Sequence, residues 1–389
     1  MTDVFILSAV RTAIGGFGGS LSGFAPIDLA SHVAKEAIAR SGVEAVQIGA
    51  SVFGHVINTE PRDMYLSRVA AMNAGIPEGA VAMNVNRLCG SGAQAIVSAA
   101  QALMLGDAEI ALAGGAECMS RAPYVLQAAR FGQKMGDTKA IDMMTGALTC
   151  PFGTGHMGIT AENVAAEGGI TRADQDAFAL ESQNRAARAI AEGRFASQIA
   201  PIEIASRKGT VSFAVDEHPK ATTAEALAGL KPAFQKDGTV TAGNASGIND
   251  GAAALVLARG DALNGRTPRA RIMGYAVAGV APRVMGLGPI PAVEKLCAKL
   301  GLKPADFDVV ESNEAFAAQA IAVNRALGLD PARVNPNGGA VALGHPVGAT
   351  GAIITVKALH ELERSGGKTA LVTMCIGGGQ GIALAIERV

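Results

Sequence analysis

The sequence lacks the features that mark several large classes of protein. No apolar run approaches the roughly 20 residues needed to cross a bilayer, and the first residues, MTDVFILSAVRTAIGG, do not read as a signal peptide. Lys and Arg number 33 against 34 Asp and Glu, so the net charge is −1 and nothing suggests a nucleic-acid partner. We therefore expect neither a membrane nor a nucleic acid as partner.

Cysteine is scarce and widely scattered. The chain has no CxxC pair and no zinc-like spacing, and its cysteines are odd in number, at positions 89, 118, 150, 297 and 375. This pattern is typical of free thiols in a reducing compartment rather than of a disulfide framework. We expect a cytoplasmic protein without a metal site.

Apolar residues and glycine are abundant in the sequence. Among 389 residues, 49% are hydrophobic, 17% are charged and 49 are Gly, and the glycines gather at the ends of short apolar runs. Strand patterns, of which residues 4–10 are the first, alternate with helix patterns. The sequence therefore predicts an α/β protein of two or three domains with large buried surfaces.

The two ends of the chain carry a diffuse repeat. A glycine-bounded helix start followed by an apolar strand occurs in LCGSGAQAIVSAAQALMLG and again in LGHPVGATGAIITVKALHEL. Aligning Cys89 on His345 places Gly92 on Gly348. We infer two similar α/β halves, in which a pseudo-twofold pairing brings both helix starts to one site.

The middle of the chain has no counterpart in this repeat. It is rich in loops and holds one clear helix pattern, opened by Thr171 as a cap with Asp174 in the first turn. A long insertion of this kind commonly binds substrate. The predicted domains are an N-terminal core (1–118 plus 242–270), a loop domain (119–241) and a C-terminal core (271–389).

Cys89 and His345 are the first candidates for chemistry. Cys89 stands where a turn enters a helix, a position that lowers a thiol pKa and leaves backbone N–H groups free for an oxyanion. His345 precedes Pro346 at the other helix start and is placed to take the thiol proton. Taken singly, Cys89 also fits a packed structural thiol and His345 fits a cap.

Two strand ends carry further candidates. Cys375 closes the apolar strand of LVTMCIGGGQG, and Asn313 follows the strand of FDVVESNEAF. Sites gather at such ends in α/β sheets, although Cys375 could equally be a buried core thiol and Asn313 a helix cap. GSGAQA fits a dinucleotide fingerprint, but Asp107 and Glu109 precede the next strand instead of ending it, which argues against NAD.

Together these motifs resemble the thiolase family. NRLCGSGAQAI, NEAFA, NPNGGAVALGHPVGATG and CIGGGQG occur in the family's order, while GHMGITAEN and VTAGNASGINDGAAA extend the likeness through the insertion. It covers essentially the whole chain and is strongest toward acetyl-CoA C-acetyltransferases. It implies two core domains of mixed sheet, with helices in layers (αβαβα), and an inserted loop domain.

The resemblance also implies roles for single residues. Cys89 would be the acyl-carrying nucleophile, activated by His345, and Cys375 the acid and base that moves a proton of the acetyl methyl group. Asn313 would hold a water that forms one oxyanion hole with His345. The N–H groups of Cys89 and Gly377 would form the other.

Coenzyme A binding is likewise carried over from the family. Lys220 would meet the nucleotide end, and a small acyl pocket would be walled by Leu148, Met157 and Met285. Positions expected along the pantetheine tunnel are His156, Met157, Phe234, Ala242, Ser246, Ala315 and Phe316.

The implied reaction is the reversible condensation of two acetyl-CoA to acetoacetyl-CoA and CoA, with CoA as substrate rather than cofactor and no cofactor required. A 3-ketoacyl-CoA thiolase of broader range is the alternative. A ketosynthase is disfavoured because Cys375 is present, and a non-catalytic CoA or lipid carrier because Cys89, His345 and Cys375 are all retained. The family also implies a homotetramer built from two dimers, with residues 121–141 between the dimers.

Overall fold

The structure is a computed structural model that describes residues 2–206 and 209–389. Two sets of strands in the same order are joined through two residue pairs between β1 and β13. The N-terminal set, from its edge inward, is β4 (Val81–Val85), β3 (Ala50–Gly54), β5 (Ile110–Cys118), β12 (Asn249–Arg259) and β1 (Val4–Arg11), with β2 (Gly15–Gly16) beside β12. The C-terminal set is β14 (Val309–Ser312), β15 (Thr369–Ile376), β16 (Gln380–Arg388) and β13 (Ala270–Gly279).

The two sets repeat one pairing scheme, which confirms the predicted pair of similar halves. β3 pairs parallel with β5 as β14 does with β15, and from β5 to β1 and from β15 to β13 each set continues with antiparallel pairs. The edge strand β4 also pairs parallel with β3. β4 extends the first set, and the matching contact in the second is a single parallel bridge between Val310 and Val334. Each half is therefore a mixed sheet.

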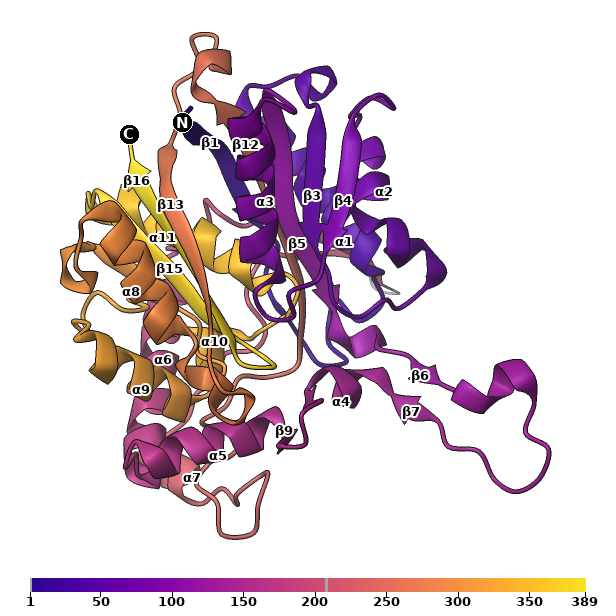
Figure 1. Cartoon of the computed structure of the whole chain (residues 1–389), viewed down its shortest axis with the longest axis vertical. Coiled ribbons are helices and arrows are strands. Elements are labelled where there is room, and N and C mark those ends of the chain that lie inside the picture. The colour runs from indigo at the N-terminus through magenta and orange to yellow at the C-terminus, as the bar shows by residue number, and fades with distance from the viewer. Residues whose placement is uncertain (1, 207–208) are drawn as a thin grey trace.

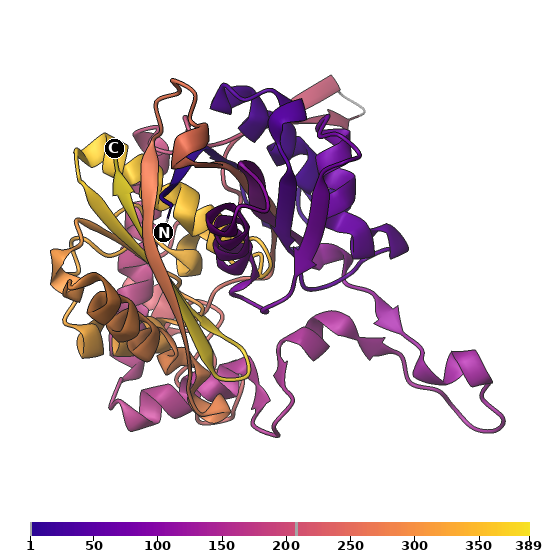
Figure 2. The ribbon, with the colours of Figure 1, turned by 45° about the horizontal axis from the view of Figure 1, so that its top comes forward.

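Helices cover these strands in layers, as predicted. α3 (Ser91–Leu105) and α11 (Thr350–Ser365) pack on each other between the two sets of strands, and Figure 2 shows α3 almost end-on in this central layer. α1 (Pro26–Ser41) and α2 (Leu66–Asn73) cover the outer face of the first set (Figure 1). The second set is covered by α8 (Pro289–Leu300), with α9 (Ala317–Leu327) and the short α10 (Ala340–Leu343) nearby.

Glycine lets the two central helices touch backbone to backbone. A Cβ added to Gly92 would lie 2.6 Å from the backbone nitrogen of Ala352, and one added to Gly351 would lie 2.2 Å from that of Ala93. Such distances exclude any side chain. The contact is reciprocal, as a pseudo-twofold axis requires.

This contact corrects the register of the repeat. It matches Gly92 with Gly351, and therefore Cys89 with Gly348 rather than with His345. The turn 346–349 separates His345 from the start of α11, so His345 lies farther from its helix than the sequence suggested. The prediction that both helix starts meet is nevertheless correct.

The apolar character of α3 follows from this central position. By length and composition, the helical segment Leu88–Leu105 could cross a membrane, and 56% of it is buried inside the protein. Polar residues, among them Gln94 and Gln101, interrupt its apolar run, so the sequence alone did not indicate a membrane span. Core helices of soluble proteins share these properties, and α3 is packed against β3, β5 and α11.

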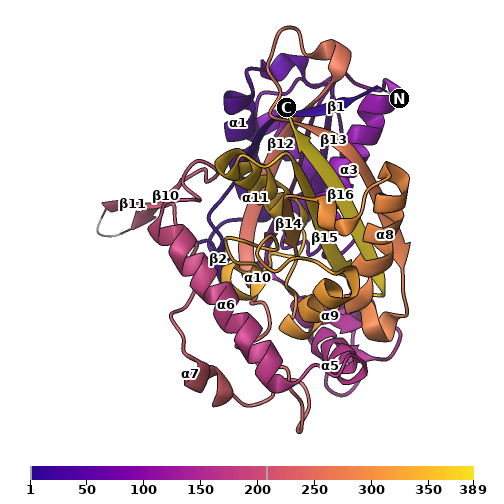
Figure 3. The ribbon, with the colours of Figure 1, turned by 90° about the vertical axis from the view of Figure 1, so that its left-hand side faces the viewer.

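The insertion lies along one end of both halves. Its longest helix, α6 (Arg172–Ala191), begins with the predicted Thr171 cap and Asp174 capping box, and in Figure 3 it runs past α9 and α10. The segment 121–142 leaves the body of the molecule in a long excursion (Figure 1). The remaining elements are α4 (Met143–Ala147), α5 (Met157–Glu167), α7 (Ala224–Ala228), β6 (Tyr124–Val125), β7 (Ile141–Asp142), β8 (Thr149–Cys150), β9 (Gly155–His156), β10 (Ile202–Ser206) and β11 (Gly209–Phe213).

Candidate active site

A cavity of about 540 Å³ lies where the two halves and the insertion meet. Three of the predicted catalytic residues line it, namely Cys89, His345 and Gly377. Cys375 and Asn313 do not line it but lie buried beside it. Every predicted substrate-binding residue lines it as well: Leu148, His156, Met157, Lys220, Phe234, Ala242, Ser246, Met285, Ala315 and Phe316.

Sequence reasoning missed the rest of the lining. Several missed residues adjoin predicted ones and could have been found by extending each motif by one or two positions. Gly16, Phe17 and Met119 had no such signal. The complete set of missed residues is Gly16, Phe17, Met119, Glu217, His218, Ala233, Ala245, Gly247, Ile248 and Val347.

Cys89 lies immediately before Gly90, the N-cap of α3, as predicted. Burial raises the pKa of the Cys89 thiol, and the nearby Glu117 charge raises it further. The backbone N–H groups of Gly377 and of Cys89 itself lower this pKa but do not outweigh burial. The expected net lowering is therefore wrong, and Cys89 rests as a thiol.

His345 is held in one tautomer by its neighbours. Its Nδ1 lies 2.6 Å from Thr350 Oγ1, and that hydroxyl donates its own hydrogen to the Pro346 carbonyl at 2.8 Å. Nδ1 must therefore carry the proton, which leaves a lone pair on Nε2. Burial lowers the pKa of His345 to about 4, so the ring is neutral near pH 7 and Nε2 can accept a proton.

Asn313 faces this lone pair. Its Nδ2 lies 3.4 Å from His345 Nε2, and its Oδ1 is buried without a protein partner among the described residues. The alternative role as a helix cap is wrong, because Phe316 is the N-cap of α9. The Asn313 amide thus lies beside the His345 imidazole.

Cys375 lies one residue before the end of β15, as predicted, and is fully buried. It packs in the apolar cluster that includes Met157 and Met285. Burial, and after it the Cys89 charge, raises the pKa of the Cys375 thiol well above its ordinary value. Once formed, a Cys375 thiolate would be a strong base.

The wall that carries Ser246 is fixed to the segment after Asn313. The Ser246 N–H donates to the Ala315 carbonyl at 3.0 Å, and Ala245 forms an antiparallel bridge with Phe316. Within residues 2–206 and 209–389, the Ser246 hydroxyl has no hydrogen-bond partner. It is therefore available to a ligand in the cavity.

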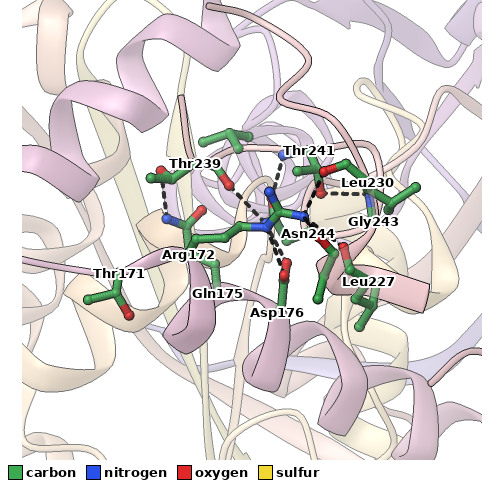
Figure 4. A network of polar contacts seen from close by, with 12 residues as sticks. Thr171, Arg172, Gln175, Asp176, Leu227, Leu230, Thr239, Thr241, Gly243 and Asn244 are labelled. Carbon is green, nitrogen blue, oxygen red and sulfur yellow. Dashed lines mark hydrogen bonds and ion pairs between the residues drawn. The ribbon is translucent and has the colours of Figure 1, made fainter. Parts of the chain in front are cut away.

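A polar network holds this wall from behind (Figure 4). Asn244 donates from Nδ2 to Asp176 at 2.9 Å and to the Thr239 carbonyl at 3.1 Å. Arg172 bonds the other oxygen of Asp176 and reaches the Leu227 carbonyl. Helix α6 thus anchors the strip 239–246.

Aromatic rings close the middle of the cavity. His156 and Phe234 stack with ring centroids 4.8 Å apart, and Phe316 meets Phe234 edge-on at 6.1 Å. His156 Nδ1 accepts the N–H of Gly158, and burial lowers the pKa of the ring. These uncharged faces suit a flexible apolar arm rather than an ionic group.

Comparison with known proteins agrees with this geometry. Residues 4–261 match the family described as thiolase, N-terminal domain, and residues 266–388 match thiolase, C-terminal domain. The chain belongs to the thiolase family. This thiolase is 58% identical to the beta-ketothiolase BktB of Cupriavidus necator, over 100% of this chain and 99% of that protein.

Other relatives of this thiolase carry different names. An acetyl-CoA acetyltransferase of Cupriavidus necator is 50% identical, with 100% of both chains covered. Human mitochondrial 3-ketoacyl-CoA thiolase, solved in complex with CoA, is 45% identical and superposes with a TM-score of 0.97, covering 100% of this chain and 98% of that one. The chain is thus an acyltransferase of the class that condenses and cleaves acyl-CoA thioesters.

Proposed function

We propose that this thiolase condenses two acetyl-CoA molecules to acetoacetyl-CoA and CoA, and catalyses the reverse thiolysis, through an acetyl group on Cys89. The observation that carries the proposal is one cavity lined by both Cys89 and His345, in which the Gly377 N–H is directed at the Cys89 sulfur and His345 keeps an unprotonated Nε2. A nucleophile, a base and an oxyanion donor are the parts that acyl transfer needs.

The first half of the reaction acylates Cys89. His345 Nε2 takes the thiol proton, and the sulfur attacks the thioester carbonyl while the N–H groups of Cys89 and Gly377 bind the oxyanion. The carbon–sulfur bond to CoA then breaks. The departing CoA thiolate takes the proton of Cys375, so CoA leaves neutral and a Cys375 thiolate remains.

The second half forms the carbon–carbon bond. The Cys375 thiolate removes a methyl proton from the second acetyl-CoA, and the enolate oxygen is stabilised by His345 together with a water held by Asn313. The carbon attacks acetyl-Cys89 and releases the Cys89 thiolate, which regains its proton from His345. Burial is the main cause that raises the pKa of Cys375, and a charge on Cys89 is the second. Acylated Cys89 carries no charge, so this second cause is absent when the Cys375 thiolate is needed.

A broader 3-ketoacyl-CoA range is the second candidate. It is favoured by the name of the relative at 58% identity, a beta-ketothiolase, against 50% for an acetyl-CoA acetyltransferase. The acyl end in this proposal is walled by Leu148, Met157 and Met285, and the Met157 N–H donates to the Leu148 carbonyl at 2.8 Å. Methionine is flexible, so such walls can yield to longer chains.

Two measurements test these proposals. After incubation with acetyl-CoA and an acid quench, mass spectrometry should find the acetyl group on Cys89; label on Cys375 but never on Cys89 would reverse the assignment. Initial thiolysis rates across 3-ketoacyl-CoA substrates of increasing length separate the candidates. A steep fall beyond acetoacetyl-CoA supports the narrow range, and a flat series supports the broad one.

We further propose a cytoplasmic homotetramer. All five cysteines are free, which suits a reducing compartment. The excursion 121–142 exposes large apolar side chains, among them Phe131 (89% exposed) and Met135 (90%), and these are costly to leave in water. The edge strand β4 likewise exposes Val81 and Met83, and a second copy could cover them.

Sedimentation tests the assembly. The chain should sediment as a tetramer at micromolar concentration, and Phe131→Ser with Met135→Ser should give dimers if the excursion joins two dimers. A monomeric wild-type protein would contradict the proposal.

A further inference from the structure

Glu117 is a buried acid that the chemistry above does not use. It lies near the end of β5 with none of its surface exposed. Burial raises the pKa of its carboxyl group, and nearby His55 opposes this effect. A buried carboxylate needs hydrogen bonds from the protein to replace those that it would make with water.

Two separate segments supply those hydrogen bonds. Oε2 accepts the N–H groups of Val56 and Gly348, each at 3.0 Å, and Oε1 accepts the N–H of Ile57 at 3.1 Å. His55 Nδ1 lies 3.3 Å from Oε1. The carboxylate therefore ties the strand β5 and the loop after β3, both in the N-terminal half, to one turn of the C-terminal half.

That turn is the one that presents the base. Gly348 lies between His345 and Thr350, the partner of His345 Nδ1. A Cβ added to Gly348 would lie 2.4 Å from the Glu117 carboxylate, so the carboxylate rests directly on the turn. Movement of Gly348 would shift both the imidazole and its acceptor.

An acid is required here despite an electrostatic disadvantage. The Glu117 charge is one of the causes that raise the pKa of Cys89, behind burial, so it opposes the thiolate. A glutamine would remove that charge, but it has one acceptor oxygen and its NH₂ group would face backbone N–H donors. Only a carboxylate can accept on both atoms.

We propose that Glu117 is a positioning residue for acyl transfer, which holds Gly348 so that the His345 imidazole stays within reach of the Cys89 thiol. The inference rests on the roles proposed above for Cys89 and His345. It assigns Glu117 no contact with the substrate, because Glu117 does not line the cavity.

Glu117→Gln tests the proposal. The kcat for exchange of labelled CoA into acetyl-CoA should fall roughly 10- to 100-fold, because buried N–H donors lose their acceptor and the turn shifts. KM should change by less than about threefold, because the cavity lining is untouched. The pH midpoint for alkylation of Cys89 by iodoacetamide should move down, since a negative charge has been removed.

Two further variants distinguish the positioning of the Gly348 turn from two other effects of Glu117→Gln. One is the loss of the Glu117 charge, and the other is a general destabilisation caused by changing a buried carboxylate. Gly348→Ala displaces the turn but keeps the carboxylate, so kcat should fall without a downward shift of the alkylation midpoint. Asp63→Asn is the matched control, because Asp63 is a buried carboxylate that accepts the N–H groups of Thr59 and Glu60 away from the cavity. Its kcat should match that of the wild type.

The inference is overturned if Glu117→Gln retains a kcat within twofold of Asp63→Asn, or if its loss lies in KM. If Glu117→Gln does not fold, Gly348→Ala becomes the deciding variant. An unchanged kcat in Gly348→Ala would then overturn the inference. Full activity of Cys89→Ser would instead remove the proposed function, so the two failures are distinguishable.

Discussion

Replacing Thr350 by valine should disable the base while leaving the nucleophile in place. The Thr350 hydroxyl accepts the Nδ1 proton of His345 at 2.6 Å and donates to the Pro346 carbonyl at 2.8 Å. Valine keeps the branched shape and removes the oxygen. The buried Nδ1–H then has no acceptor.

The size of the effect follows from that lost acceptor. An unsatisfied buried donor costs about 1–3 kcal/mol, which corresponds to roughly a 5- to 150-fold loss of rate if the cost falls on the transition state. The imidazole can instead carry its proton on Nε2, but this tautomer has no lone pair on Nε2 to take the Cys89 proton. Burial already holds the pKa of His345 at about 4, and losing the acceptor disfavours the imidazolium further.

Exchange of labelled CoA into acetyl-CoA is the appropriate assay, since it requires acylation of Cys89 but no carbon deprotonation. Thr355→Val is the matched control. Thr355 is buried in the same helix and its hydroxyl donates to the Gly351 carbonyl at 2.8 Å, but it makes no bond to His345. If the two variants show exchange rates within twofold of each other, the assigned tautomer is wrong.

Three further outcomes are expected. Cys375→Ser should reduce condensation far more than CoA exchange, because serine is a poor carbon base; equal losses would exclude that role. Asn244→Ala removes the amide that bonds Asp176, so KM for acetyl-CoA should rise severalfold with a smaller change in kcat, and an unchanged KM would contradict the anchoring role. Burial lowers the pKa values of His345 and His360 to about 4, from an ordinary value of 6.5. As the pH falls from 6.5 to 4, the unfolded chain therefore binds protons before the folded chain does, and the free energy of unfolding should fall by on the order of 3 kcal/mol per residue. The midpoint of denaturant unfolding, measured across this pH range, should vary less in His345→Asn than in the wild type.

Much of the fold could be predicted because local chemistry decides it. Val4–Arg11 is apolar and β-prone, Thr171 and Asp174 form a capping box, and glycines bound the helix around Gly92. The register of the repeat could not be predicted, because it is set by which backbones touch. Gly92 of α3 touches the backbone of Ala352 in α11, and these two residues are far apart in the sequence.

The candidate site divides in the same way. Residue types and motif order placed Cys89, His345 and Ser246 on one cavity. The sign of the Cys89 pKa shift was wrong, since the helix-start effect is local whereas burial depends on the whole assembled structure. The position of Glu117 could not be predicted for the same reason, because its hydrogen-bond partners come from distant segments.

The glycine contact between α3 and α11 also bears on how the chain acquires activity during folding. Neither half can shape the cavity alone, because Cys89 enters from one half and His345 and Gly377 from the other. Contacts between residues far apart in the chain form slowly, since a long loop must close, with a loss of entropy, before the contact can stabilise the structure. Circular dichroism should therefore recover before catalysis in a refolding experiment, with the interval reporting the docking of two already structured halves.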